Sequence, residues 1–273
     1  TNKLDWAMGE LLAYGSLMSE GFDVRISGQD VERGTFSHRH AVVKVEDSEE
    51  EVILLDKIKD KKGNFYIYNS HLSEYGVLGF EYGYALASPK SLVIWEAQFG
   101  DFSNGAQIMI DQYISAGEDK WNNQNGLVML LPHGYENQGA EHSSARMERY
   151  LQMCAKHNMY IADVTSPANF FHLMRRQLKT EFRKPLVVFS PKSLLRHPDV
   201  VSSMDELANG QFQEVIDDPK IADKKAIKTL VFCTGKVYFD IIAQREELGR
   251  NDVAVVRLEQ LFPLAVDQIK AII

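Results

Sequence analysis

The chain has 273 residues, of which 45% are hydrophobic and 25% charged, and its formal net charge is -8. This acidic surplus argues against nucleic acid as the main partner, because a phosphate-binding surface needs an excess of Lys and Arg. No apolar stretch approaches the roughly 20 residues that a membrane span requires. The two cysteines, Cys154 and Cys233, lie in apolar segments and are expected to be reduced thiols.

Strand-like and helix-like segments alternate along the chain. Helices are expected over 5–18, 74–87, 103–117, 143–157, 166–178 and in the C-terminal PLAVDQIKAII, and strands over 22–27, 65–70, 91–97, 126–132, 159–164, 185–190, 227–235 and within 252–263. The charged segment 45–64 reads as a surface excursion. This alternation predicts an α/β fold with mostly parallel sheets flanked by helices, and ligands are expected at the carboxyl ends of its strands.

Polar segments interrupt the alternation between residues 195 and 227. We therefore expect one domain over 1–197, followed over 198–273 by a linker and the beginning of a second α/β domain. Both ends of the chain fall in or near predicted helices, so we expect a piece of a longer polypeptide. The sequence has no G-x-G-x-x-G, Walker A, G-x-S-x-G, H-E-x-x-H or C-x-x-C motif, which argues against a dinucleotide-binding or P-loop enzyme within this segment.

Four polar stretches are candidate sites, and each has a structural alternative. The first stretch, SGQDVERGTFSHRH (27–40), follows a predicted strand, and its polar residues suit a ligand site or a solvated loop. His38 and His40 are not expected to bind a metal, because no third ligand has a suggestive spacing. EAQFGDFSNGAQ (96–107) places Phe99 and Phe102 where they can face a planar ligand, or they are core residues.

The third stretch, LLPHGYENQGAEHSSARMERYL (130–151), holds His133 and His142 around a glycine-containing loop, with Ser143 or Ser144 expected to cap the next helix. A histidine before a helix N-terminus can exchange protons and bind oxyanions, or both histidines are structural hydrogen-bonding groups. The fourth stretch, RKPLVVFSPKSLLRHP (183–198), is an anion site or a basic surface patch, and the patch is favoured.

The stretch HLSEYGVLGFEYGYALA (71–87) raises a separate question. Ser73 is a good N-cap for a helix with an apolar face and three glycines, yet Glu74 places a carboxylate in its first turn. Taken in order, this stretch and the four above resemble the thiamine-diphosphate-dependent 2-oxoglutarate dehydrogenase family, the decarboxylating first components of a multienzyme complex. The resemblance covers nearly the whole chain and implies a transketolase-like pyrimidine-binding domain followed by the start of a C-terminal domain.

The resemblance also implies roles for individual residues. Glu74 matches the carboxylate that lies against the pyrimidine ring of thiamine and favours the imino tautomer that activates the cofactor. Phe102 matches the aromatic side chain that stacks on the aminopyrimidine, with Phe99 beside it. His142 matches a catalytic histidine that contacts the substrate-derived intermediate, and Gln29 matches a further substrate contact.

The family implies thiamine diphosphate and Mg²⁺ as cofactors, the metal being held through a G-D-G…N motif of an upstream domain that this sequence lacks; no metal ligand is expected here. We therefore expect weak or no thiamine diphosphate binding by this chain alone. The implied reaction is oxidative decarboxylation of 2-oxoglutarate in the tricarboxylic acid cycle, with succinyl transfer to a lipoyl group. The implied partners are a second subunit of a homodimer and the lipoyl-bearing succinyltransferase core, in the bacterial cytoplasm or the mitochondrial matrix. The alternatives are another 2-oxo acid, such as 2-oxoadipate or pyruvate, and an inactive dimerisation or docking fragment.

Overall fold

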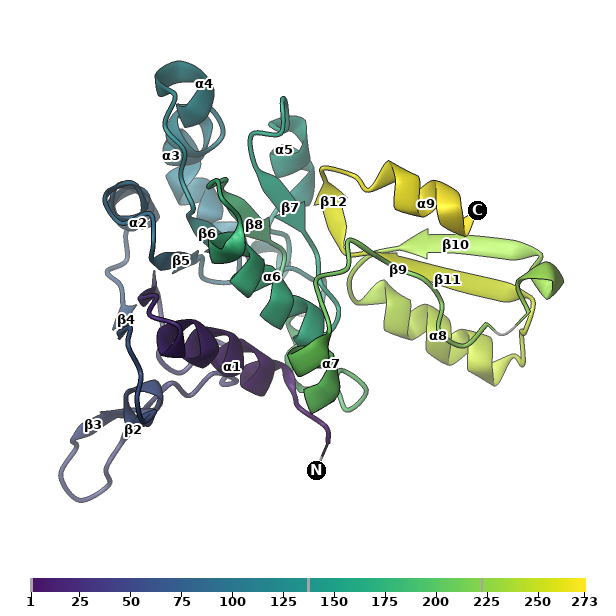
Figure 1. Cartoon of the computed structure of the whole chain (residues 1–273), viewed down its shortest axis with the longest axis horizontal. Helices are drawn as coiled ribbons and strands as arrows, with labels where there is room; N and C mark the ends of the chain where they lie inside the picture. The colour runs from purple at the N-terminus through teal and green to yellow at the C-terminus, as the bar shows by residue number, and fades with distance from the viewer. Residues whose placement is uncertain (1, 137, 222) are drawn as a thin grey trace.

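A seven-stranded sheet organises the computed structural model, which describes residues 2–136, 138–221 and 223–273. The strands lie in the order β12-β7-β8-β6-β5-β1-β4 (Figure 1). Their bounds are Val24–Gly28 for β1, Phe65–Asn69 for β4, Leu92–Glu96 for β5, Val128–Leu130 for β6, Tyr160–Ala162 for β7, Leu186–Val188 for β8 and Gln260–Phe262 for β12. β12 runs antiparallel to β7, and the other neighbouring pairs are parallel. The predicted α/β fold with a mostly parallel sheet is confirmed.

Helices cover both faces of this sheet. α1 (Trp6–Ser19) and α6 (Pro167–Lys179) pack against each other on one face, where side chains such as Ile26 and Ile94 are fully buried. α2 (Glu74–Ala87), α3 (Gln107–Met109) and α5 (Met147–Gln152) contribute to the core on the other face. Burial on both faces explains why the central strands are continuous apolar runs rather than alternating ones.

Local capping defines where the long helices begin. Asp5 accepts from the Met8 amide at 2.9 Å at the start of α1. Ser73 accepts from the Gly76 amide at the start of α2, and Ser166 caps α6 with Pro167 in its first turn. These side chains satisfy amides that have no partner within the helix. The observed bounds of α1, α2 and α6 lie within one residue of the predicted helices.

The predicted helix over 103–117 is wrong in detail. A 3₁₀ helix spans Asp101–Ala106, α3 follows, Ile110–Ile114 forms a π-helical turn, and α4 spans Gly117–Trp121. The π-helical turn interrupts the α-helical repeat, and Met109, Ile110 and Ile114 are buried in the core on this face of the sheet. The predicted excursion over 45–64 contains β3 (Glu51–Ile53), which forms a hairpin with the preceding β2 (Val42–Lys44); this hairpin projects from the body (Figure 1).

A second, three-stranded sheet lies in the C-terminal part, in the order β10-β11-β9. Its strands are β9 (Val215–Ile216), β10 (Thr229–Cys233) and β11 (Val253–Leu258), accompanied by α7 (Met204–Asn209), α8 (Val237–Glu247) and α9 (Val266–Ile272). After β11 the chain returns through Glu259 to the first sheet, where β12 pairs with β7. In the described part of the chain, no helix is long and apolar enough to cross a membrane.

Candidate active site

The candidate residues converge at the carboxyl edge of the parallel strands. Gln29 directly follows β1, and Glu74 opens α2 a few residues after β4. Phe99 and Phe102 follow β5, and His142 ends a 3₁₀ turn in the loop after β6. Because parallel strands present their carboxyl ends at the same edge, residues more than 100 positions apart are brought to one place.

Glu74 lies at the N-terminus of α2 and is half-buried. Its Oε1 accepts a hydrogen bond from Gln29 Nε2 at 3.0 Å. The carboxylate also faces Gly105, where an added Cβ would come within 3.3 Å of Glu74 Oε2. The Glu74 carboxylate therefore lies at the positive end of the α2 dipole, beside the amide of Gln29. Gly105 lacks a side chain and leaves room beside this carboxylate.

Three rings form a cluster around the 3₁₀ helix Asp101–Ala106, which contacts α2. Phe99 and His142 stack, with ring centroids 4.2 Å apart and planes inclined by 22°. Phe102 lies 5.8 Å from the His142 ring and remains 37% exposed. The turn that carries these phenylalanines requires a glycine, because Gly100 has φ +69° and a Cβ there would lie 2.1 Å from the Pro132 carbonyl oxygen. Phe102 thus presents an exposed aromatic face beside a partly exposed imidazole.

The His142 ring has one nitrogen turned inward and one toward solvent. Nδ1 is buried and has no hydrogen-bond partner among the described residues, and Nε2 lies 3.8 Å from Glu141 Oε1. The side chain of His142 is 30% exposed. Because Nδ1 is buried, a ligand or a transferring proton would reach this partly exposed imidazole at Nε2.

The predicted helix directly after His142 is wrong. Ser143 and Ser144 bond within their own loop, to the Gly139 carbonyl and the Arg146 amide, rather than capping a helix. Arg146 takes the left-handed conformation with φ +57° and forms an ion pair with buried Asp101, so α5 begins only at Met147. The helix-dipole argument for His142 therefore does not apply to this loop, of which residue 137 lies outside the described part.

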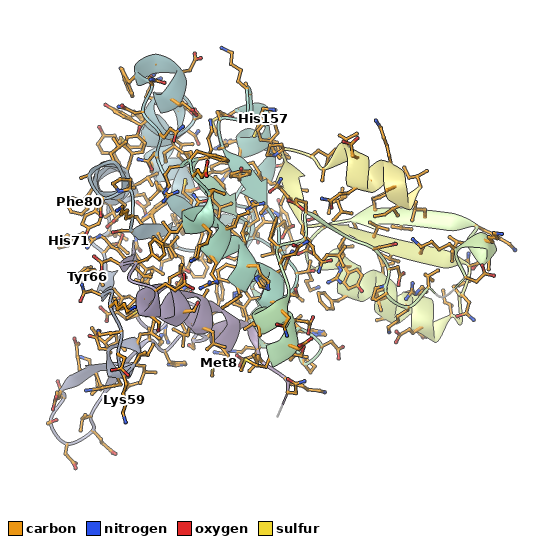
Figure 2. The ribbon with its side chains drawn as sticks, viewed as in Figure 1. Met8, Lys59, Tyr66, His71, Phe80 and His157 are labelled. Carbon is orange, nitrogen blue, oxygen red and sulfur yellow. The ribbon has the colours of Figure 1, made fainter. Side chains whose placement is uncertain are left out.

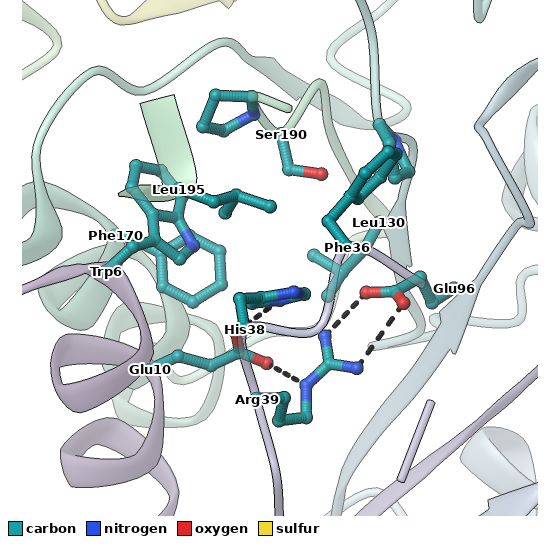
Figure 3. A pocket seen from close by; sticks show the side chains of 12 residues that line it. Trp6, Glu10, Phe36, His38, Arg39, Glu96, Leu130, Phe170, Ser190 and Leu195 are labelled. Carbon is teal, nitrogen blue, oxygen red and sulfur yellow. Dashed lines mark hydrogen bonds and ion pairs between the residues drawn. The ribbon is translucent and has the colours of Figure 1, made fainter. Parts of the chain in front are cut away.

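A buried ion network holds the loop that follows β1 (Figure 3). The Arg39 guanidinium bonds Glu10 of α1 at 2.6 Å and Glu96 at the end of β5 at 2.5 Å, and donates to the Val31 carbonyl at 2.8 Å. Burial alone would raise the pKa of Glu10, but the charge of Arg39 and the neighbouring His38 outweigh it and lower the pKa from 4.5 to about 2. The network ties the loop bearing Gln29 to both a helix and a central strand.

Sequence reasoning placed Arg39 in a candidate site but missed Glu10, because α1 lies far from that loop along the chain. His38 Nε2 lies 3.6 Å from Glu10 Oε2, and both side chains line a cavity of about 10 Å³ with Phe36 and Trp6 (Figure 3). The ring of Phe36 meets Phe99 edge-on at 5.9 Å. The side chains of His38 and Arg39 are therefore buried, whereas Arg33 and His40 are exposed, so the stretch is only in part a solvated loop.

The basic stretch 183–198 does not form the favoured surface patch. Lys184, just before β8, forms an ion pair with Glu118 of α4. Arg196, which follows β8, donates to the Phe36 carbonyl at 2.6 Å. Lys192 is 3% exposed and donates to the His142 carbonyl. Burial, together with the Lys192 charge, lowers the pKa of His133, whose Nδ1 accepts from the Ala145 amide at 3.1 Å.

The residues present fit the pyrimidine half of thiamine. A carboxylate at a helix N-terminus, an amide beside it, a glycine that leaves space and an exposed phenylalanine ring are the groups that a flat, nitrogen-containing ring requires. Within 2–136, 138–221 and 223–273, no group of three or more His, Cys, Asp or Glu side chains is arranged to hold a metal ion. A separate cleft of about 870 Å³ lies between α6, α7 and α8; His197 of the fourth stretch lines it, but Gln29, Glu74, Phe99, Phe102 and His142 do not.

Two family patterns match the chain. The pattern described as "Transketolase, pyrimidine binding domain" matches residues 2–198, and the one described as "2-oxoglutarate dehydrogenase C-terminal" matches residues 201–273. The chain belongs to the transketolase pyrimidine-binding family. This agrees with the resemblance deduced from the sequence strings.

Curated relatives are similar along almost all of this chain. A 2-oxoglutarate dehydrogenase E1 component of Haemophilus influenzae is 54% identical over 98% of the chain, and one of Cupriavidus necator is 54% identical over 95%. A mitochondrial 2-oxoglutarate dehydrogenase of Caenorhabditis briggsae is 51% identical over 98% of the chain. The chain spans 29%, 28% and 29% of the length of these relatives.

Proposed function

We propose that this chain supplies the pyrimidine-binding half of the active site of a 2-oxoglutarate dehydrogenase. The observation that carries the proposal is the placement of Glu74 at the start of α2, hydrogen-bonded to Gln29 and facing Gly105. The aromatic cluster of Phe99, Phe102 and His142 next to it gives the second part of a cofactor pocket. The relatives named 2-oxoglutarate dehydrogenase support the choice of substrate.

In this proposal the side chains bind and orient thiamine diphosphate. Glu74 would hold a proton toward the pyrimidine nitrogen, and Gln29, whose amide bonds the Glu74 carboxylate, would contact the substrate-derived group. Phe102 stacks on the aminopyrimidine, and Phe99 supports the ring of His142 from behind. The bound cofactor supplies the carbanion chemistry that cleaves a 2-oxo acid. His142 holds or moves a proton at the substrate-derived group through a ring nitrogen.

The diphosphate and Mg²⁺ are proposed to bind through another domain, because the described residues contain no metal-ligand cluster. We therefore expect this chain alone to bind thiamine diphosphate weakly or not at all. A calorimetric titration of the chain with thiamine diphosphate and Mg²⁺ tests this, and tight binding would contradict it. We also propose the division into a pyrimidine-binding domain over 1–197 and the start of a second domain over 198–273.

We further propose that the protein is a homodimer that works with a lipoyl-bearing succinyltransferase core, in the bacterial cytoplasm or the mitochondrial matrix. Large apolar side chains remain exposed on and near α2, which supports a protein interface there: these are Leu72, Tyr75, Phe80, Ile108, Tyr113 and Trp121. Figure 2 shows Phe80 and His71 along one outer edge of the molecule. Sedimentation of the complete polypeptide tests the dimer, and a monomer at micromolar concentration would contradict it.

The decisive experiment uses the complete polypeptide that contains this chain. Reduction of an artificial electron acceptor is followed with 2-oxoglutarate, 2-oxoadipate or pyruvate, each with and without thiamine diphosphate and Mg²⁺. Cofactor-dependent turnover of 2-oxoglutarate in preference to the others is expected. Turnover of another acid would retain the proposed roles of Glu74 and His142 but change the substrate. No cofactor-dependent turnover would favour a docking role for the chain.

A further inference from the structure

The loop that carries His142 is held by a lysine from a different part of the chain. Lys192 follows β8, fifty residues after His142, and is 3% exposed. Its ammonium donates to the backbone carbonyl of His142 and lies 3.4 Å from that of Ser143. In the described residues no carboxylate lies within ion-pair distance of this ammonium, so two adjacent carbonyls of one loop are its partners.

This arrangement is unusual for a lysine, because a buried ammonium is costly unless it is paired with a negative charge. Glu136 and Asp101 are near enough to favour the charged form of Lys192, although burial lowers its pKa overall. The hydrogen bonds of Lys192 go to the segment that presents the histidine.

The loop needs such support, because little regular structure holds it. The His142 amide donates to the Gly139 carbonyl at 3.3 Å, and the Gly134 amide donates to the Ser143 carbonyl at 3.0 Å. The His142 ring stacks on Phe99. Lys192 holds the backbone of the loop at the His142 and Ser143 carbonyls, so His142 is held at its backbone by the ammonium and at its ring by Phe99.

We propose that Lys192 is a positioning residue that fixes the His142 backbone and thereby directs its ring toward the bound substrate. This inference deepens the proposed function and, for its kinetic part, rests on it. Lys192 acts through His142 and not on the cofactor, because Glu74 and Gln29 bond each other independently of it.

The first test measures kinetics of the complete polypeptide. Lys192→Met removes the donor, and kcat for 2-oxoglutarate is expected to fall about 10- to 100-fold, since small displacements of a catalytic group have effects of this size. The dissociation constant of thiamine diphosphate is expected to stay within about twofold of the wild-type value, because the hydrogen bonds of Lys192 go to the His142 loop. Lys192→Gln keeps an N–H donor and is expected to retain more turnover. Lys184→Met, which removes another partly buried lysine at the opposite end of β8, is the matched control and is expected to keep wild-type kcat.

A double-mutant cycle separates positioning from general structural support. If Lys192 works through His142, then Lys192→Met combined with His142→Ala is no slower than His142→Ala alone. Losses that multiply in the double variant would overturn the inference, as would wild-type kcat in Lys192→Met. Should Lys192→Met fail to fold, the same cycle is run with Lys192→Leu, which also removes the donor.

Amide hydrogen exchange tests the same inference without turnover. The amides of Gly134 and His142 are expected to exchange faster in Lys192→Met than in the wild type, and to be unchanged in Lys184→Met. Unchanged exchange at both amides in Lys192→Met would overturn the inference. If the wild-type polypeptide fails to turn over 2-oxoglutarate, the proposed function fails, and hydrogen exchange still decides whether Lys192 holds the loop.

Discussion

Removal of the Arg39 guanidinium is expected to be the most destabilising single change near the candidate site. Arg39 bridges Glu10 and Glu96, and the three side chains are 1%, 1% and 6% exposed. Arg39→Met preserves most of the volume of the side chain but leaves two buried carboxylates without their shared cation. Breaking a buried ion pair from one side costs about 3–5 kcal/mol.

The lowered pKa of Glu10 corresponds to a free energy of similar size. In the folded protein this pKa is lowered from 4.5 to about 2, a difference that corresponds to about 3 kcal/mol at 1.36 kcal/mol per pH unit. Because the folded pKa lies below the unfolded one, this stabilisation is complete above pH 4.5 and is lost as the pH falls toward 2. Arg39→Met is therefore expected to lose about 3–5 kcal/mol of unfolding free energy at pH 7.

Urea denaturation at pH 7, followed by tryptophan fluorescence, measures this loss, since Trp6 and Trp95 are both buried in the core. Arg250→Met is the matched control, because Arg250 pairs with Asp252 on the surface, and its urea midpoint is expected to stay close to the wild-type value. If Arg39→Met shifts the midpoint no more than this control does, the reasoning about the buried network is refuted.

Three further predictions concern the site and the junction of the two sheets. Glu74→Ala is expected to lower turnover of the complete polypeptide by about 100-fold or more with the fold intact, whereas Glu181→Ala on the surface leaves it unchanged. Burial and the nearby Glu259 raise the pKa of Asp163 from 3.8 to about 7. Since the folded pKa lies above the unfolded one, the wild type loses stability as the pH rises from about 4 to 7. Asp163→Asn is therefore expected to be more stable than the wild type at pH 8, by about 4 kcal/mol at most, but not at pH 4. Gly105→Ala places a Cβ 3.3 Å from the Glu74 carboxylate and is expected to weaken thiamine diphosphate binding about tenfold, whereas Gly83→Ala meets open space and stabilises α2 by about 0.5–1 kcal/mol.

Each of these predictions has an outcome that contradicts it. Wild-type turnover of Glu74→Ala would remove this carboxylate from the proposed mechanism. Urea midpoints of Asp163→Asn that follow the wild type at every pH would show that Asp163 titrates in its ordinary range. Unchanged calorimetric affinity of the complete polypeptide for thiamine diphosphate in Gly105→Ala would show that no ligand approaches Glu74 from this side.

Local signals in the sequence determined the elements and their order. Apolar runs marked the strands of the first sheet, and the N-cap Ser73 marked the start of α2, because these signals depend on neighbouring residues only. The same order of strands brought Gln29, Phe99 and His142 to one edge of a parallel sheet. The long specific strings identified the family, which the two matching patterns confirm.

Contacts between distant segments decided the rest. The left-handed Arg146 and the late start of α5 depend on Asp101, forty-five residues earlier, and no local pattern contains that pairing. Glu10 was unrecognised for the same reason, since its partner Arg39 lies twenty-nine residues away in another element. Lys192 looked like part of a surface patch, because the sequence records its charge but not its burial. Hydrophobic period and capping are properties of a segment, whereas the burial and pairing of a charge are properties of the packed structure.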